Sequence, residues 1–273
     1  MTAASARTVL IAGAGDVGGR LASLRAALGD DVIAVRRRDA EASGRVRVLR
    51  ADLVGGHGFD RLPRRPEAVV FCAAPDRRDE AAYRALFVDG LRRLLDRVDA
   101  ERFVFVSSTA VYAEDAGEWV DEATPARPPA FNGRVLMEAE HELAAHGEAA
   151  VLRLSGLYGP GRMALIERAR GDTPARPRWS NRIHVEDAAA ALSHLLDLAG
   201  LQSLYLGNDD LPALETEVVA WIRRQEGLPV LPAADETPSG RRVSNARLRI
   251  GGWSPRFPDY ASGYLPLLAK PGV

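Results

Sequence analysis

The sequence predicts an α/β protein built on a doubly wound parallel sheet. Short apolar segments rich in β-branched residues alternate with segments of helical periodicity through the first half of the chain. One of the apolar segments, residues 68–74, is uninterrupted. Strands of a parallel sheet are buried on both faces and therefore give such continuous runs, and a strand–helix alternation is typical of right-handed crossovers between parallel strands.

The elements of this half are predicted from periodicity and from their flanking residues. The expected strands are residues 8–12, 32–35, 45–49, 68–74, 103–108 and 150–154, and the expected helices are residues 17–28, 79–98 and 133–145. The helix at 79–98 is indicated by apolar residues that fall near one side, among them Leu86, Leu91 and Leu94. Residues 113–130 carry acidic residues, prolines and glycine, so we expect a loop there.

The pattern changes after Tyr158. Proline- and glycine-rich connections separate expected helices at 162–170, 185–199 and 213–226, and residues 204–206 are an expected strand. Residues 229–242 are polar and rich in proline, which is typical of an exposed loop. We therefore predict a larger domain at 1–157 and a smaller C-terminal α/β lobe at 158–273, with an approximate boundary.

The composition and net charge limit which kinds of binding partner and which cellular location are expected. The 36 basic and 37 acidic residues give a net charge of −1, so the chain as a whole has no electrostatic bias toward nucleic acid or an anionic membrane. No apolar stretch approaches the length of a membrane span. Cys72 is the only cysteine, which excludes an internal disulfide and offers no metal cluster. We expect a cytoplasmic protein without a metal site, and we note that Lys270 is its only lysine.

A glycine motif, Gly13-Ala14-Gly15-Asp16-Val17-Gly18, follows the first predicted strand and opens the first predicted helix. In this context the first glycine permits a tight turn, the second lets a pyrophosphate approach the backbone, and the third lets the helix pack on the strand. The free N–H groups and positive dipole end of the helix favour phosphate binding. We therefore predict a dinucleotide site that includes Gly13, Gly15, Asp16, Val17 and Gly18.

Three arginines, Arg36, Arg37 and Arg38, stand at the end of the second predicted strand. An acidic residue at this place would hydrogen-bond the ribose hydroxyls of NAD, whereas a guanidinium suits the charge and geometry of a 2′-phosphate. The sequence therefore predicts NADP as the coenzyme, with NAD less favoured. The alternative is that the three arginines form only a solvated basic edge.

Several motifs together resemble the extended short-chain dehydrogenase/reductases, specifically the NAD(P)-dependent epimerase/dehydratase group and its atypical members. The motifs are the glycine turn, Asp52-Leu53, Cys72-Ala73-Ala74, Ser107-Ser108-Thr109-Ala110-Val111-Tyr112, residues 153–162 and residues 181–187. The resemblance implies a Rossmann-type fold with a C-terminal substrate-binding lobe. It also implies that Asp52 contacts the adenine amino group with Leu53 beside the ring, and that Cys72, Ala73 and Ala74 line the ribose and diphosphate. Ser107 is assigned to the coenzyme site and Ser108 to the active-site hydroxyl.

The proton relay that the resemblance implies is missing. Such enzymes use a Tyr-x-x-x-Lys pair, in which the ammonium favours ionisation of the phenol. The corresponding positions here are Asn132 and Leu136, or Phe131 and Val135 in the neighbouring register, so neither register supplies a phenol or an amine. Besides Ser108, we assign Tyr158 as a candidate catalytic residue, with water or the substrate as other routes for the proton.

Two further residues, His184 and Asp187, stand at the start of the helix expected at 185–199. Aspartate near a helix start is more often a cap than a catalyst, and we expect His184 to be a hydrogen-bonded structural residue.

The sequence thus predicts an NADP-preferring oxidoreductase or epimerase-like protein that acts on a small carbonyl, alcohol or sugar nucleotide with a non-standard proton donor. One alternative is a non-catalytic NADP-binding sensor or regulatory protein. Another is an isomerase or lyase that uses the coenzyme structurally. A homodimer that pairs the helices at 79–98 and 133–146 with their copies is also expected, because isologous dimers are the commonest oligomers.

Overall fold

The computed structural model describes residues 6–38, 44–232 and 237–268, so Lys270 lies outside the described residues. The chain forms two compact units that are interleaved along the sequence. The first unit comprises Met1–Val111, Ala126–Arg153 and Ala189–Tyr205, and the second comprises Tyr112–Pro125, Leu154–Ala188 and Leu206–Val273.

The first unit is built on a seven-stranded sheet with the strand order β11-β7-β5-β4-β1-β2-β3. Its strands are β1 (Thr8–Ala12), β2 (Asp31–Arg36), β3 (Val46–Arg50), β4 (Ala68–Phe71), β5 (Arg102–Ser108), β7 (Glu148–Leu154) and β11 (Leu204–Gly207). Neighbouring strands from β3 to β5 are parallel. The chain runs outward from β1 to β3 and then returns to place β4 on the other side of β1, so the strand order reverses between β1 and β4.

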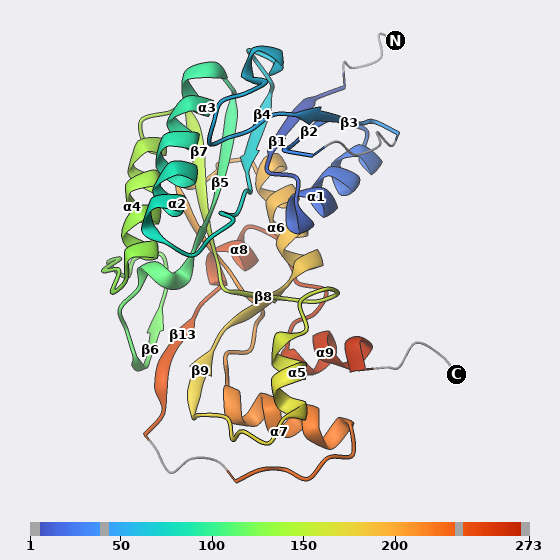
Figure 1. The fold of residues 1–273 in the computed structure, drawn as a ribbon, viewed down its shortest axis with the longest axis vertical. Coiled ribbons are helices and arrows are strands. Elements are labelled where there is room, and N and C mark those ends of the chain that lie inside the picture. Colours follow the sequence, from blue (N-terminus) through green and yellow to red (C-terminus); the bar gives the residue numbers. More distant parts are fainter. Residues whose placement is uncertain (1–5, 39–43, 233–236, 269–273) are drawn as a thin grey trace. The chain divides into compact units, whose positions relative to one another are not determined.

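Helices cover both faces of this sheet, with α2, α3 and α4 on one face and α1 and α6 on the other (Figure 1). Their bounds are α1 (Asp16–Ala27), α2 (Glu80–Arg84), α3 (Leu91–Arg97), α4 (Phe131–Leu143) and α6 (Val185–Asp197), with 3₁₀ turns η1 (Phe59–Arg61) and η3 (Thr109–Val111). Residues Val9–Ala12 and Ala68–Phe71 have no exposed surface, as expected of strands covered on both sides. The doubly wound parallel sheet predicted from the sequence is confirmed.

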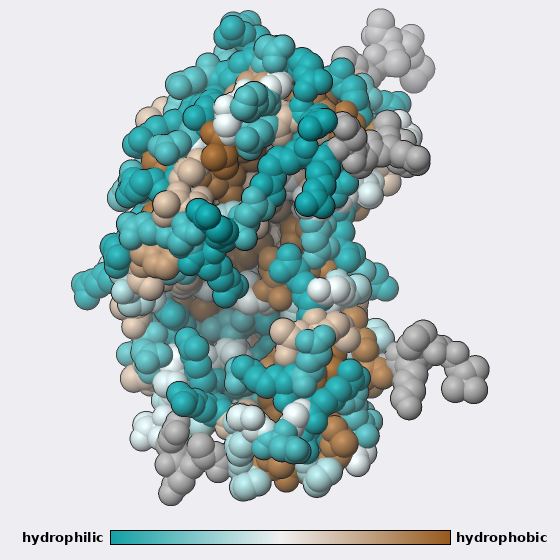
Figure 2. Space-filling model, viewed as in Figure 1, coloured by the Kyte–Doolittle hydropathy of each residue, from teal (hydrophilic) through white to brown (hydrophobic). Residues whose placement is uncertain are grey.

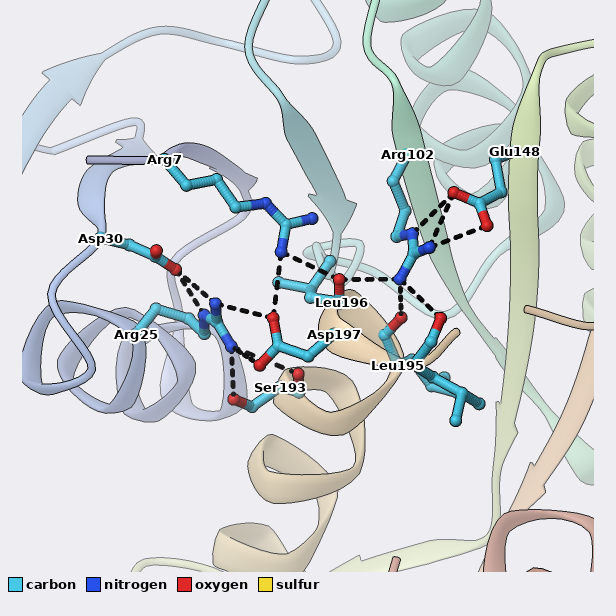
Figure 3. A network of polar contacts seen from close by, with 10 residues as sticks. Arg7, Arg25, Asp30, Arg102, Glu148, Ser193, Leu195, Leu196 and Asp197 are labelled. Atoms are coloured by element: carbon cyan, nitrogen blue, oxygen red, sulfur yellow. Dashed lines mark hydrogen bonds and ion pairs between the residues drawn. The ribbon is translucent and has the colours of Figure 1, made fainter. Parts of the chain in front are cut away.

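The end of α6 is held by arginine side chains of the first unit (Figure 3). Arg102 Nη1 donates to the carbonyl oxygens of Leu195, Leu196 and Leu198 at 2.8–3.1 Å. The buried Arg25 guanidinium bonds both Asp30 and Asp197. The Arg102 bonds satisfy carbonyl groups that a helix end leaves without intrahelical partners, and the Arg25 bonds hold the Asp197 side chain at the same helix end.

The second unit contains a four-stranded sheet with the order β12-β9-β13-β6 and a parallel pair, β10 and β8. The bounds are β6 (Ala116–Val120), β8 (Gly156–Tyr158), α5 (Ala164–Arg170), β9 (Arg178–Ser180), β10 (Arg182–His184), β12 (Ala213–Leu214), α7 (Glu215–Gln225), β13 (Ser239–Val243), α8 (Ala246–Ile250) and α9 (Tyr260–Leu268). Its core includes Ile166 of α5, Val218 and Ile222 of α7, Tyr158 and Tyr264.

Some expected elements differ from the structure. The segment 113–130, expected as loop, contains β6, and the segment 229–242, also expected as loop, contributes most of β13. The expected helix at 79–98 is divided into α2, a π-helical segment η2 (Ala85–Gly90) and α3. The expected helix at 213–226 begins two residues later, because Ala213 and Leu214 form the short strand β12.

Hydrophilic residues predominate on the face shown in Figure 2, and hydrophobic residues appear there as smaller patches. Among the described residues, no helix combines the length and the apolar character needed to cross a bilayer. Nor do the described residues bring together three or more His, Cys, Asp or Glu side chains in an arrangement that could hold a metal ion.

Candidate functional site

The glycine turn that follows β1 is closely packed at two of its three glycines. Gly13 has a φ of +97°, and a Cβ built on it would stand 2.5 Å from the backbone of Ala73. A Cβ on Gly18 would stand 2.5 Å from the Gly13 carbonyl oxygen. Both distances are far below van der Waals contact, so the fold requires glycine at both positions.

Gly15 differs, because a Cβ built there would have no atom within 4 Å. Gly15 is also the N-cap of α1 and provides no side-chain cap for the helix amides. Asp16 in the first turn is paired with Arg20 at 2.9 Å, which offsets its charge near the helix N-terminus. Open space beside uncapped amides at a positive dipole end is a suitable environment for a phosphate group.

A basic cluster occupies the carboxyl ends of β2 and β3. Arg36 is the register partner of Arg50, so these two side chains start from neighbouring backbone positions. Arg37 and Arg50 line a pocket of about 700 Å³ together with Ala51, Asp52, His57, Gly58 and Arg61. Arg36, Arg37 and Arg38 are all exposed. The pocket therefore has three guanidinium groups and one carboxylate in its wall, which favours an anionic ligand.

Asp52 and Leu53, assigned to the adenine, follow β3 directly. The two Asp52 carboxylate oxygens accept the amide protons of Val54 and Gly55, each at 3.0 Å. Leu53 is buried, and its carbonyl oxygen would lie 2.9 Å from a Cβ built on Gly90 of the π-helical segment. The loop is thus fixed by its own carboxylate on one side and by close packing on the other.

Cys72, Ala73 and Ala74, assigned to the ribose and diphosphate, follow β4. The Cys72 amide donates to the Ala12 carbonyl at 2.8 Å, which continues the pairing of β4 with β1 up to the glycine turn. The backbone of Ala73 forms the close contact with Gly13 described above. These residues and the glycine turn therefore meet at the edge of the sheet where the strand order reverses.

The Ser107 side chain belongs to a buried network that sequence analysis did not anticipate. Its hydroxyl donates to Glu140 of α4 at 2.6 Å, and Arg153 of β7 binds the same carboxylate through two nitrogens at 2.5 and 3.0 Å. All three residues are less than a tenth exposed. This network attaches α4 to β5 and β7 and engages the only O–H of Ser107.

Ser108 ends β5 and is half-buried. Its oxygen accepts the Ala110 amide proton at 3.2 Å, a bond that leaves the hydroxyl proton available for donation. Asn132 and Leu136 lie one turn apart on α4, and Glu140 follows after another turn. Leu136 and Val135, the two residues expected at the lysine position in the alternative registers, are 4% and 1% exposed and pack in the core.

Tyr158, the second assigned catalytic residue, lies in the core of the second unit. Its hydroxyl is buried without a hydrogen-bond partner among the described residues, and its ring contacts those of His184 and Tyr264. Burial raises the pKa of the Tyr158 phenol above its ordinary value. A phenol in this environment is a poor donor or acceptor of a catalytic proton.

His184 and Asp187 make local hydrogen bonds in the second unit. The His184 Nδ1 accepts the Glu186 amide proton at 3.3 Å, and the Asp187 carboxylate accepts the amide protons of Arg256 and Phe257 at 2.7 and 3.0 Å. These contacts give both residues a structural role in joining the start of α6 to the loop before α9.

Four residues at the edge of the sheet were not found from the sequence. Arg50, His57 and Arg61 line the basic pocket, and Asp76 pairs with Arg37. The available signal was positional, because Arg50 directly follows the predicted strand 45–49 and Asp76 follows the predicted strand 68–74. The carboxyl ends of parallel strands meet at one edge of the sheet, so both residues could have been placed there.

Comparisons with known proteins identify the family. A family model described as the NAD dependent epimerase/dehydratase family matches residues 9–202. The chain belongs to this family. The family resemblance predicted from the sequence is thereby confirmed.

Individual relatives agree with this assignment. Protein YeeZ of Escherichia coli (strain K12) is 36% identical over 116 residues, which are 40% of this chain and 42% of YeeZ. The match to this curated relative thus spans less than half of its length. A structure of the NAD-dependent epimerase/dehydratase type from Methylobacillus flagellatus is 36% identical, with a TM-score of 0.84 over 97% of this chain and 98% of that one. The human epimerase family protein SDR39U1, solved with NADPH, shares the fold at 18% identity, with a TM-score of 0.74 over 96% and 99% of the two chains.

Proposed function

We propose that this member of the NAD dependent epimerase/dehydratase family binds NADP in preference to NAD and uses it to oxidise or reduce a small carbonyl, alcohol or sugar-nucleotide substrate. The observation that carries the proposal is the arrangement at the carboxyl ends of β1, β2 and β3. There a glycine turn with open space at Gly15 lies next to a cluster of arginines. The structure of SDR39U1, which shares this fold and was solved with NADPH, supports a nicotinamide coenzyme, and the arginines carry the proposed preference.

The residues present fit such a coenzyme. The open space at Gly15 and the uncapped amides of α1 suit the pyrophosphate, and the exposed guanidinium groups of residues 36–38 suit a 2′-phosphate. Asp52 retains acceptor capacity for the adenine amino group, since each carboxylate oxygen accepts only one amide proton from its own loop. When bound, the nicotinamide supplies the hydride chemistry of the reaction.

The proton chemistry rests on Ser108 and on a donor that differs from the usual phenol. The hydroxyl proton of Ser108 is available to bind a substrate oxygen, whereas Tyr158 is buried and resists ionisation. We propose that Ser108 orients the substrate and that water or the substrate itself completes the proton transfer. The second unit, in this proposal, contributes substrate-binding residues.

Binding followed by turnover tests the activity. NADPH is titrated while its fluorescence is followed, and NADPH consumption is then measured with a panel of aldehydes, quinones and sugar nucleotides. Consumption that is lost in Ser108→Ala supports the oxidoreductase. Binding without consumption across the panel supports the non-catalytic sensor instead, and failure of both coenzymes to bind overturns the proposal.

The coenzyme preference is tested with the double variant Arg36→Ala/Arg37→Ala. Because charge-assisted hydrogen bonds to a phosphate contribute about 1.5–3 kcal/mol, we expect the Kd for NADP to rise roughly 10- to 100-fold. The Kd for NAD should change by less than about threefold, because NAD carries no 2′-phosphate. Arg64→Ala/Arg65→Ala, which removes two exposed arginines before β4, is the matched control. Equal losses for NADP and NAD would contradict the assignment.

A further inference from the structure

Arg37 has an anionic partner within the protein. Its guanidinium faces the Asp76 carboxylate end-on, with Nη2 at 2.5 Å from Oδ1 and Nη1 bonded to Oδ2. Both side chains are more than half exposed, at 57% and 63%. The hydrogen bonds from Arg37 lower the pKa of the Asp76 carboxyl, so Asp76 is a permanent negative charge at neutral pH.

The ion pair joins the segments that follow two strands on either side of β1. Arg37 follows β2 and Asp76 follows β4, and β1 lies between these two strands (Figure 1). The pair therefore spans two strand spacings, about 10 Å, over the carboxyl end of β1. This is the point where the strand order reverses, and ligands of doubly wound sheets bind at such points.

Arg37 also lines the basic pocket on its other side, where β2 meets β3. That pocket includes Arg50, His57 and Arg61, and Asp52 supplies its carboxylate. Arg37 thus has two anionic partners to choose from. One is the Asp76 carboxylate across β1, and the other is an anion bound in the pocket, whose excess positive charge favours such a ligand. The two Nη atoms of Arg37 cannot bond Asp76 and a phosphate in this end-on arrangement at the same time.

We propose that Asp76 limits the preference for NADP over NAD by competing with the 2′-phosphate of NADP for the guanidinium of Arg37. This inference rests on the NADP preference proposed above. A 2′-phosphate must displace Asp76 from Arg37, and this displacement reduces the advantage of NADP over NAD. Exposed ion pairs are weak, so the exchange is feasible, but the negative charge that Asp76 leaves nearby still opposes the phosphate.

The test is the isosteric variant Asp76→Asn, which removes the charge of an exposed side chain and is not expected to disturb folding. The Kd values of NADP and NAD are measured by titration in the same buffer. We expect the Kd for NADP to fall roughly three- to tenfold, which corresponds to about one exposed charge interaction, and the Kd for NAD to change less than about twofold.

Two comparisons make the result specific to Asp76. Asp31→Asn is the matched control, because Asp31 forms an ion pair with Arg45 of similar exposure, 59% and 52%, at the opposite end of β2. This control should leave both Kd values unchanged. In the Arg37→Ala background, Asp76→Asn should lose most of its effect on NADP, because its partner is gone.

Other results of the same measurements would overturn the role proposed for Asp76. An unchanged or raised Kd for NADP in Asp76→Asn, or equal shifts for both coenzymes, would overturn the role of Asp76. An undiminished effect in the Arg37→Ala background would also overturn it, because Asp76 would then act without Arg37. If the unmodified protein binds neither coenzyme, the proposed function itself has failed, which is a separate outcome.

Discussion

Gly15 and Gly18 lie three residues apart in the same turn, but the space around their Cα atoms differs. A Cβ on Gly18 would press on the Gly13 carbonyl oxygen at 2.5 Å, whereas a Cβ on Gly15 would have no neighbour within 4 Å. The protein itself therefore explains why residue 18 is glycine and does not explain residue 15. The proposed explanation for Gly15 is a ligand that needs the same space.

The two glycine-to-alanine variants should consequently separate stability from binding. Gly15→Ala is expected to lower the free energy of unfolding by only about 1 kcal/mol, because Gly15 is the N-cap of α1 and alanine is disfavoured at that position. The same variant should weaken NADPH binding at least roughly tenfold, because its methyl group enters the space proposed for the pyrophosphate. Gly18→Ala should lower the free energy of unfolding by about 2–4 kcal/mol through its clash with the backbone. Chemical denaturation and NADPH titration measure the two quantities. Similar binding by Gly15→Ala and the unmodified protein would contradict this use of the turn.

The residues of this site differ in how far they could be predicted from sequence. The glycine turn and Arg36–Arg38 could be assigned because each lies next to a strand that its own apolar residues identify. The pair of Arg37 with Asp76 could not, because it depends on β4 returning to the side of β1 opposite β2. The buried network in which Ser107 and Arg153 both bind Glu140 likewise joins three elements, and no local pattern specifies it.

The strands likewise differ in whether their own residues predict them or whether they depend on pairing with distant segments. Strands β1 and β4 were predictable because they are continuous apolar runs buried on both faces. Strands β6 and β13 have neither an apolar run nor a clear alternation, since each contains glycine and charged residues. They form by pairing with each other in parallel over a long sequence separation. Tertiary pairing, rather than local propensity, determines these strands.

Helix α6 depends on side chains from other elements for its C-terminus (Figure 3). Arg102 of β5 binds three carbonyl oxygens there and pairs with Glu148 of β7 at 2.7 Å, while Arg7 binds the Leu196 carbonyl at 2.9 Å. A planar guanidinium serves several acceptors at once, which a single ammonium does less well. The use of arginine in place of lysine therefore matters at this position.

Removing Arg102 should destabilise the protein measurably. Arg102→Ala leaves three carbonyl groups without this donor, and we expect a loss of about 2–4 kcal/mol in the free energy of unfolding. Arg102→Lys should recover only part of this loss. Glu148→Gln, which leaves the carbonyl contacts in place, should cost no more than about 1 kcal/mol. Urea denaturation compares the variants, and a loss in Arg102→Ala no larger than in Glu148→Gln would show that the carbonyl contacts contribute little.

At the scale of the whole molecule, self-association remains a prediction. The helices expected to form a dimer interface carry ion pairs on their surface, namely Arg84 with Glu138 at 2.8 Å and Arg92 with Glu142 at 2.5 Å. Burying such pairs against a second copy would require their desolvation. No large exposed hydrophobic side chain lies on α2, α3 or α4, so an interface through these helices would depend on polar contacts.

The free energy of unfolding of the whole molecule should depend on pH through one buried carboxyl group, that of Asp209. Asp209 is 1% exposed, and neither of its carboxylate oxygens makes a hydrogen bond of good geometry within the described residues. Burial raises the pKa of Asp209 to about 8, although the nearby Arg182 guanidinium and the backbone amide of Leu211 act in the opposite direction. The folded protein therefore retains a proton on Asp209 under conditions in which the unfolded chain has lost it.

This difference fixes the sign of the pH dependence. The stabilisation associated with the proton is complete below the unfolded-state pKa, about 4, and is lost as the pH rises toward about 8, at up to roughly 1.4 kcal/mol per pH unit. Asp209→Asn keeps the shape of the neutral side chain and does not titrate. The unfolding free energy of the unmodified protein should therefore fall relative to that of Asp209→Asn between about pH 5 and about pH 8. Denaturation curves across this range test the prediction, with Asp172→Asn as a control that removes an exposed carboxylate from the same unit. Parallel pH profiles for the unmodified protein and Asp209→Asn would mean that Asp209 is ionised or hydrated in the folded state.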